Sequence, residues 1–258
     1  MKRIIILSLF TLIIASTTFG QQPQPKPSEA KAATPQAAAA GPTIDQILDR
    51  YVKALGGRAA IEKLKTRETR GTFQIVDTPL KGVVESYNKA PNKLAIFTRV
   101  PGLGDFLEGY DGNVSWAQDP ANGLRDRSGV ELAQAKFDAE FYKDIKMKEL
   151  YPKMELKGTE KVGGRDAYVI LATPAVHSPE QLYFDVQTGL LVRADVVREG
   201  PQGKSPFSVF YEDYREVDGV KIPFLLRQTA TDFGVIIKLD SVKHNVAIDD
   251  AKFSKPIR

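Results

Sequence analysis

The chain has 258 residues, and the 42% that are apolar suffice for the core of one large domain. Its formal charge of +4 owes much to Lys2, Arg3, Lys26 and Lys31, so the rest of the chain is nearly neutral and lacks the basic excess with which proteins bind nucleic acids. The absence of cysteine excludes disulfides, thiolate metal sites and a cysteine nucleophile.

Residues 1–20 have the pattern of a secretory signal peptide. Lys2 and Arg3 precede an apolar run over residues 4–14, which is shorter than the roughly 20 residues of a membrane-spanning helix. The small residues Thr18 and Gly20 suit cleavage after Gly20. With no cysteine at that point the mature chain cannot carry a lipid anchor, so we expect a periplasmic protein. A retained N-terminal anchor is the alternative.

Residues 21–42 are rich in Gln, Pro, Ala and Lys and contain no aromatic residue. Such a segment cannot bury enough apolar surface to fold, which predicts a disordered linker. No second linker and no internal repeat follow, so residues 43–258 are expected to form one domain.

This domain is expected to begin with a helix. Thr43 is a candidate N-cap, and the apolar residues from Ile44 to Leu55 recur with helical spacing. Gly56 and Gly57 end the pattern as a glycine C-cap does. A second, short helix is predicted at residues 59–64.

After these helices the apolar period changes from about 3.6 to 2 residues, which indicates strands. Tight turns separate them, and Asp111-Gly112 is the most diagnostic because this pair favours hairpins. Strands are predicted at 69–76, 82–89, 93–100, 106–110, 114–117, 155–161, 167–173, 181–186, 190–199, 207–217, 222–231 and 235–246. Residues 121–128 are predicted to be a polar connection, and Pro223 should lie at an edge or a bulge.

Residues 129–150 interrupt the strands and are predicted to form one helix. Ala133, Phe137, Phe141 and Ile145 recur every four residues, which places them on one stripe. Charged residues including Asp138 and Asp144 should fall largely on the other faces. An apolar helix between strands must lie against their sheet, where it either fills the core or covers a cavity.

Many of the predicted strands alternate between apolar and polar residues. Leu182 and Phe184 share one face, as do Ile222, Phe224 and Leu226 in a later strand. One face of the sheet is therefore apolar and the other mostly wet. The predicted fold is mainly β (α+β): an incomplete antiparallel β-barrel or a strongly curved sheet of about 11–13 strands with an N-terminal helix.

Three motifs resemble the LolA-type lipoprotein carriers. They are the turn Lys89-Ala90-Pro91-Asn92, the hairpin Tyr110-Asp111-Gly112-Asn113-Val114-Ser115-Trp116, and the ending Asp249-Asp250-Ala251-Lys252-Phe253. The order of helix, strands, helical insert and further strands is also similar, and the resemblance covers most of residues 43–258.

The resemblance implies a barrel whose apolar interior takes acyl chains and whose insert belongs to a lid. The implied pocket and lid residues are Leu94, Ile96, Phe106, Trp116, Phe137, Phe141, Tyr142, Ile145, Phe184, Val209, Tyr211 and Phe224. One residue departs from the pattern: the family's turn has an arginine that holds the lid closed, and Ala90 stands in its place here.

The sequence shows no active site. His177 and His244 lack metal-ligand spacing and are expected to be ordinary surface or strand residues, and no G-x-S-x-G elbow is present. We therefore expect a non-catalytic, monomeric carrier of lipid or lipoprotein acyl chains, without metal or cofactor. The alternative is a domain with a packed core that binds an envelope membrane protein. An enzyme would need polar residues that converge in the pocket.

Overall fold

The computed structural model describes residues 41–231 and 233–256, and Thr43–Arg258 form a compact unit distinct from Met1–Pro42. The expected signal peptide and all but the last two residues of the expected linker lie outside the described residues. Within the described part of the chain, no helix is both long and apolar enough to cross a membrane.

The unit begins with α1 (Ile44–Ala54), followed by α2 (Arg58–Glu62). The predicted N-cap is confirmed: the Thr43 hydroxyl accepts a hydrogen bond from the Gln46 backbone N–H, and the Gln46 side chain accepts one from the Thr43 N–H. This reciprocal capping box satisfies two of the backbone donors that a helix start leaves free.

The described residues form 13 strands in a single antiparallel sheet, as the sequence predicted. The strands are β1 (Thr66–Ile75), β2 (Lys81–Lys89), β3 (Lys93–Val100), β4 (Gly104–Tyr110), β5 (Ser115–Asp119), β6 (Gly123–Asp126), β7 (Lys153–Val162), β8 (Arg165–Thr173), β9 (Glu180–Asp185), β10 (Leu191–Gly200), β11 (Gly203–Val217), β12 (Val220–Thr229) and β13 (Gly234–His244). The predicted polar connection at 121–128 is wrong, because β6 pairs with β5 there.

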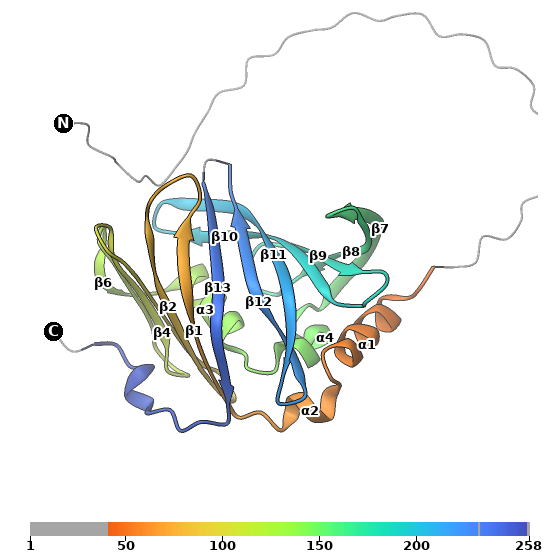
Figure 1. The fold of residues 1–258 in the computed structure, drawn as a ribbon, viewed down its shortest axis with the longest axis horizontal. Coiled ribbons are helices and arrows are strands. Elements are labelled where there is room, and N and C mark those ends of the chain that lie inside the picture. The colour runs from red at the N-terminus through yellow and green to blue at the C-terminus, as the bar shows by residue number, and fades with distance from the viewer. Residues whose placement is uncertain (1–40, 232, 257–258) are drawn as a thin grey trace, which may run out of the picture. The chain divides into compact units, whose positions relative to one another are not determined.

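The sheet consists of two meanders, β1–β6 and β7–β13, which are joined where the first strand pairs with the last. Neighbouring strands follow one another along the chain except where β1 pairs with β13, and β6 and β7 are the edge strands. The sheet curves strongly without closing (Figure 1). Pro223 was expected at an edge or a bulge. The pairing of β11 with β12 keeps one register on both sides of Asp213, so no bulge occurs there, but the pairing of β12 with β13 begins only at Leu225, so Pro223 lies where β12 is paired on one side alone.

The insert, residues 129–150, connects the two edge strands. It is not the single predicted helix but α3 (Gly129–Ala139), the 3-10 turn η1 (Lys143–Ile145) and α4 (Met147–Leu150). The chain leaves the helix at Glu140, whose ψ of 109° is extended, and the Phe141 N–H donates to the Pro91 carbonyl across the molecule at 2.9 Å. That long-range hydrogen bond replaces the bond that would have continued the helix.

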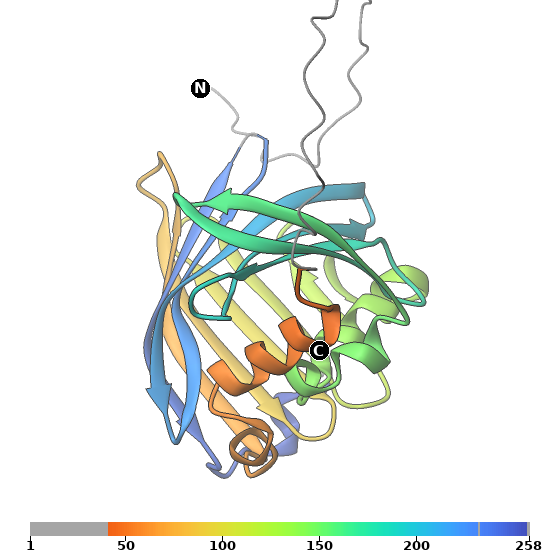
Figure 2. The ribbon, with the colours of Figure 1, turned by 90° about the vertical axis from the view of Figure 1, so that its right-hand side faces the viewer.

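The inner face of the sheet carries the main core. Tyr211, Leu226, Ile237 and Phe73 lie directly opposite one another on successive strands. The α1 helix and the insert lie side by side against this face (Figure 2), and Tyr51 of α1 is among the buried residues there. Because these helices are short, they cover the inner face only in part.

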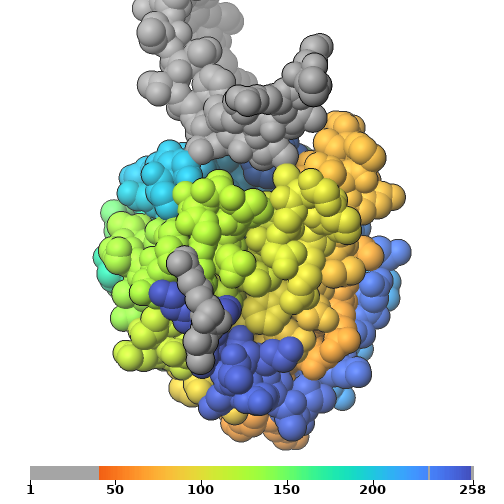
Figure 3. Space-filling model, turned by 90° about the vertical axis from the view of Figure 1, so that its left-hand side faces the viewer, coloured from red at the N-terminus to blue at the C-terminus, as the bar shows by residue number. Residues whose placement is uncertain are grey.

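A second cluster lies on the outer face. Tyr87, Ala95, Gly109 and Trp116 form one cross-strand row, opposite in side to the inner face. The C-terminal segment covers this row (blue in Figure 3), with Phe253 fully buried and its carbonyl accepting a 2.8 Å hydrogen bond from the Trp116 indole. Two of the motifs on which the family resemblance rested therefore contact each other.

Both histidine side chains are buried, so the expected surface position is wrong for His177, whereas His244 is a strand residue, as expected. His244 on β13 lies between the Arg67 guanidinium, which donates to its Nε2 at 3.1 Å, and Asp218, 3.1 Å from its Nδ1. Burial, followed by the charge of Arg67, lowers the pKa of His244 even though Asp218 opposes the shift.

His244 makes stability depend on pH. The unfolded chain takes up a proton near pH 6.5 and the folded chain only at lower pH, so this contribution is complete above pH 6.5 and is lost as the pH falls through the folded pKa. Urea unfolding between pH 7.5 and 5 should show a falling free energy of unfolding for the wild type and a flatter curve for His244→Gln. Parallel curves would contradict this assignment.

Gly109 is needed because the Trp116 ring lies against it. A Cβ there would lie within 3 Å of the indole. Gly109→Ala should destabilise the fold by about 1–3 kcal/mol through overpacking and should shift the emission of Trp116, the sole tryptophan, to longer wavelength. Gly200→Ala is the matched control, because the nearest atom to a Cβ there is 3.9 Å away. Equal stability of the two variants would refute the tight contact.

Candidate functional site

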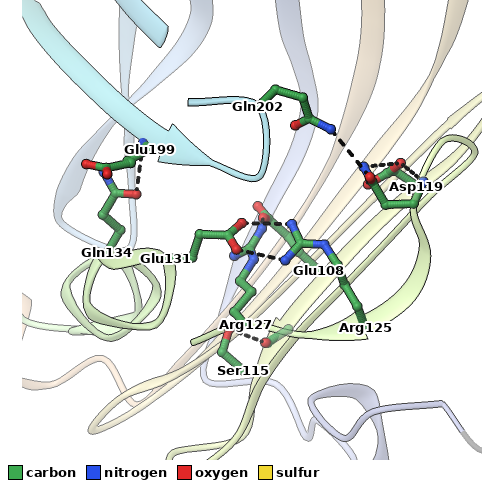
Figure 4. Close-up of polar contacts among 11 residues, drawn as sticks. Glu108, Ser115, Asp119, Arg125, Arg127, Glu131, Gln134, Glu199 and Gln202 are labelled. Carbon is green, nitrogen blue, oxygen red and sulfur yellow. Dashed lines mark hydrogen bonds and ion pairs between the residues drawn. The ribbon is translucent and has the colours of Figure 1, made fainter. Parts of the chain in front are cut away.

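The side-chain amide of Gln134 attaches the insert to the sheet by hydrogen bonds to the backbone of β10, as a neighbouring strand would. Gln134 of α3 is buried; its Nε2 donates to the Val197 carbonyl at 3.1 Å, and its Oε1 accepts from the Glu199 N–H at 3.2 Å (Figure 4). The pairing of β10 with β9 ends at Asp195, so these groups of β10 lie beyond it. Gln134 thus satisfies backbone groups that would otherwise be left without a partner.

Ion pairs add to this attachment at the start of α3. Glu131 accepts two hydrogen bonds from Arg125 of β6 at 2.7 and 2.8 Å, and Arg127 pairs with Glu108 of β4 (Figure 4). All four side chains are partly buried, and the bidentate geometry of the Arg125 pair gives it directional strength. The first turns of the insert are therefore bound to the β4–β6 wall.

The turn in which the family has its arginine still contacts the insert, but through the backbone. Pro91 accepts the hydrogen bond from Phe141, and the Tyr142 hydroxyl donates to the Leu64 carbonyl at 2.9 Å and lies 3.0 Å from the Lys65 amine. The insert is thus held beside Ala90 by the Pro91 backbone, and the nearby Leu64 and Lys65 add contacts to Tyr142.

A cavity of about 80 Å³ lies between the insert and strands β9 to β11. Its walls combine apolar and charged side chains, in contrast to the purely apolar interior that the resemblance implies. The lining residues are Phe137, Asp138, Lys143, Asp144, Met147, Leu150, Tyr151, Glu180, Leu182, Leu191, Ala194, Arg198 and Tyr211.

Tyrosine hydroxyls bind two of the carboxylates. Tyr51 donates to Asp144 at 2.7 Å, and Tyr151 donates to the buried Glu180 at 2.6 Å. Burial first, and then the adjacent carboxylate, raises the pKa of each of these tyrosines well above its usual value. Both hydroxyls therefore remain protonated donors at any physiological pH.

The third carboxylate, Asp138 of α3, pairs with Arg198 of β10 at 2.9 Å. Burial opposes the charge on Arg198, but Asp138 and Glu180 together outweigh it and raise the pKa of the guanidinium. Its Nη1 is buried and makes no hydrogen bond to any described residue. A buried donor left unpaired is costly, which makes this atom a candidate contact for a ligand.

A second hollow, of about 320 Å³, opens at the tip of β3 and β4. Its polar side chains, Arg99 and Asp105, lie 3.7 Å from each other as an exposed pair. None of its lining residues has a buried polar side-chain atom without a hydrogen-bond partner, so the cavity beneath the insert is the better candidate site.

The structure brings most of the residues implied by the resemblance to the inner face. Eight belong to its core or pack against it: Phe137, Phe141, Tyr142, Ile145, Phe184, Val209, Tyr211 and Phe224. Leu94, Ile96 and Phe106 follow the inner-face register on β3 and β4, with Phe106 38% exposed. Their binding role stays a prediction.

Trp116 is the exception. Its indole lies on the outer face beneath Phe253, so the prediction that it lines the interior is wrong. Apolar side chains occur on both faces of this hairpin, and alternation alone could not tell which face was the inner one.

Sequence reasoning missed the polar residues of the cavity. Asp138 and Asp144 were expected on the wet faces of one continuous helix, and the break near Glu140 changes the direction of the chain between them. Glu180 and Arg198 are 18 residues apart in the sequence. They lie on the neighbouring strands β9 and β10, and only the sheet brings them together. The only available signal was that buried carboxylates need a partner, and this rule does not show which residues are buried.

The architecture defines a class of protein, one in which a curved antiparallel sheet carries helices against its inner face. Solved structures share it. A DUF1329 family protein from Desulfovibrio piger matches with 18% identity and a TM-score of 0.56 over 82% of this chain and 97% of that one. A LolA superfamily protein from Nitrosomonas europaea matches with 12% identity and a TM-score of 0.55 over 83% and 99%.

A structure described as an outer membrane lipoprotein-sorting protein domain, from Vibrio parahaemolyticus, matches with 11% identity and a TM-score of 0.54 over 81% and 96%. No protein-family model and no curated protein matches the sequence. The fold of this chain is therefore the LolA-like fold, and the resemblance drawn from the three motifs is confirmed at the level of fold.

Removal of the Gln134 amide tests how the insert is held. Gln134→Ala leaves the Val197 carbonyl and the Glu199 N–H without partners, which should cost about 1–3 kcal/mol of unfolding free energy. Amide exchange should accelerate at Glu199 and along α3. Lys136→Ala, an exposed change on the same helix, should leave both readouts unchanged. Similar exchange in the two variants would exclude Gln134 as the fastening.

Proposed function

We propose that this protein is a non-catalytic periplasmic carrier that shields acyl chains of lipoproteins or other lipids against the inner face of its sheet. Two lines support the proposal. The fold is shared with a domain described as lipoprotein-sorting, and the N-terminal sequence has the pattern of a secretory signal. Fold alone does not define function, so the argument depends on the inner face itself.

The observation that carries the proposal is an apolar row that the helices leave partly uncovered. Tyr211, Leu226, Ile237 and Phe73 oppose one another across four central strands, and each is only half-buried. Phe106, farther along the same face, is exposed. Contiguous apolar surface that a fold leaves accessible commonly marks a binding site for apolar ligands.

The volume of the cavity determines where an acyl chain can bind. One water-sized group needs roughly 10–15 Å³ of cavity, so the cavity of about 80 Å³ beneath the insert takes only a few such groups and is far too small for an acyl chain. A chain must therefore lie along the uncovered row or displace the insert. Burial of ten methylenes contributes about 8 kcal/mol before ordering costs, which exceeds the strength of a few hydrogen bonds.

A second candidate is a domain with a packed core that contacts an envelope protein. The observation in its favour is that α1 and the insert fill part of the interior, where Ile47, Leu48 and Tyr51 are buried. The two candidate functions differ in whether the purified protein contains bound lipid. Mass spectrometry of organic extracts from the purified protein should detect bound lipid for the carrier and none for the packed domain.

Adjacent leucines on β12 provide a matched test. Leu226 faces inward beside Ile237, whereas Leu225 pairs with Lys238 on the outer side, and both are half-buried. Titration with a fluorescent fatty acid should show binding by the wild type, about tenfold weaker binding by Leu226→Glu, and binding within about twofold of wild type by Leu225→Glu.

Circular dichroism should establish that both variants are folded before the titrations are compared. Absence of binding by folded wild type would reject the carrier function. Equal weakening by the two substitutions would show that the fatty acid does not lie on the inner face.

A further inference from the structure

The cavity beneath the insert offers hydrogen-bond donors that the protein does not use. Arg198 directs Nη2 to Asp138, and its Nη1 is buried without a partner. The hydroxyl of Tyr211, on the neighbouring strand, makes no hydrogen bond to a described residue, and burial raises its pKa so that it stays protonated. The two residues that carry these donors, Arg198 and Tyr211, line the same small cavity.

The cavity also offers acceptors. Glu180 accepts a hydrogen bond from the Tyr151 hydroxyl through Oε2, and its Oε1 lies 4.0 Å from Nδ1 of His177. Asp144 accepts one hydrogen bond from Tyr51 through Oδ1. A carboxylate offers about four lone-pair directions, so both groups retain capacity to accept a hydroxyl proton.

The charges around the cavity favour an uncharged ligand. Three acidic residues, Asp138, Asp144 and Glu180, line the cavity together with the basic residues Arg198 and Lys143. An anion that reached the free Nη1 would also meet three carboxylates, and a cation would meet the guanidinium. A neutral group with both carbonyl and hydroxyl oxygens can satisfy the donors and the acceptors without adding an unpaired charge.

The volume limits the size of this group. A cavity of about 80 Å³ holds a few heavy atoms, such as an ester with its attached hydroxyls, but no hydrocarbon tail. Apolar residues adjoin the charged ones, since Phe137, Met147 and Leu182 share the lining. A tail could therefore leave the cavity along the apolar inner face.

We propose that this cavity is a headgroup subsite for an uncharged, hydroxylated lipid, such as a glyceryl ester. Arg198 Nη1 and the Tyr211 hydroxyl donate to its oxygens, and Glu180 and Asp144 accept from its hydroxyls. The subsite rests on the proposed carrier function, because it assigns the polar end of a ligand whose tail occupies the inner face.

The test compares three ligands that share one tail. Monooleoylglycerol, oleate and oleylamine displace the neutral dye N-phenyl-1-naphthylamine from the purified full-length chain at pH 7.5. Monooleoylglycerol should be effective at about tenfold lower concentration than either charged ligand. The readout is this preference ratio within each protein, so differences in tail binding between variants cancel.

Two substitutions locate the preference. Arg198→Met should reduce the ratio about fivefold or more, and Tyr211→Phe, which removes a hydroxyl that makes no hydrogen bond to a described residue, should reduce it about two- to fivefold. Arg193→Met is the matched control: Arg193 lies on the same strand and also pairs with an aspartate, Asp195, but in the outer-face network with Tyr183. Its ratio should equal that of the wild type.

The outcomes separate the two proposals. If all three lipids displace the dye equally, or if Arg198→Met retains the full preference, the headgroup subsite is overturned while the carrier function stands. If neither dye nor lipid binds the folded protein, both proposals fail. A preference for oleate or oleylamine would overturn the assignment of an uncharged headgroup.

Discussion

The main constraint on this protein is the apolar inner face of a long curved sheet that does not close. Since β6 and β7 are the edge strands and are consecutive along the chain, the segment that joins them must span the opening. The insert does so, and it packs apolar residues such as Phe137 and Ile145 against the sheet as it crosses. The cover over the inner face is thus a direct consequence of strand order.

Polar contacts add to this apolar packing and fix the position of the insert. Gln134, the Phe141 N–H and the Tyr142 hydroxyl each bond a backbone carbonyl of another element. Such bonds are directional, and each contributes little net stability because water offers similar partners when they open. A cover held in this way has a defined position over the inner face.

The outer-face cluster serves a different purpose. Trp116, Phe97 and Phe253 pack together on the side away from the helices, and the C-terminal segment is bound there by the indole hydrogen bond. This cluster gives the β2–β5 wall a core of its own. The inner face of that wall therefore does not depend on a filled interior for its stability, which is consistent with its half-exposed Ile96 and exposed Phe106.

The sequence by itself determined the features that arise from local geometry. Alternation along a strand and spacing along a helix are properties of neighbouring residues, so most of the strands and the N-cap at Thr43 could be predicted. Only the tertiary structure decided where the insert breaks, which face Trp116 occupies, and that Asp138, Glu180 and Arg198 meet in one cavity. These depend on the pairing of β1 with β13 and on the contact between Pro91 and Phe141, which join residues far apart in the chain and leave no local period in the sequence.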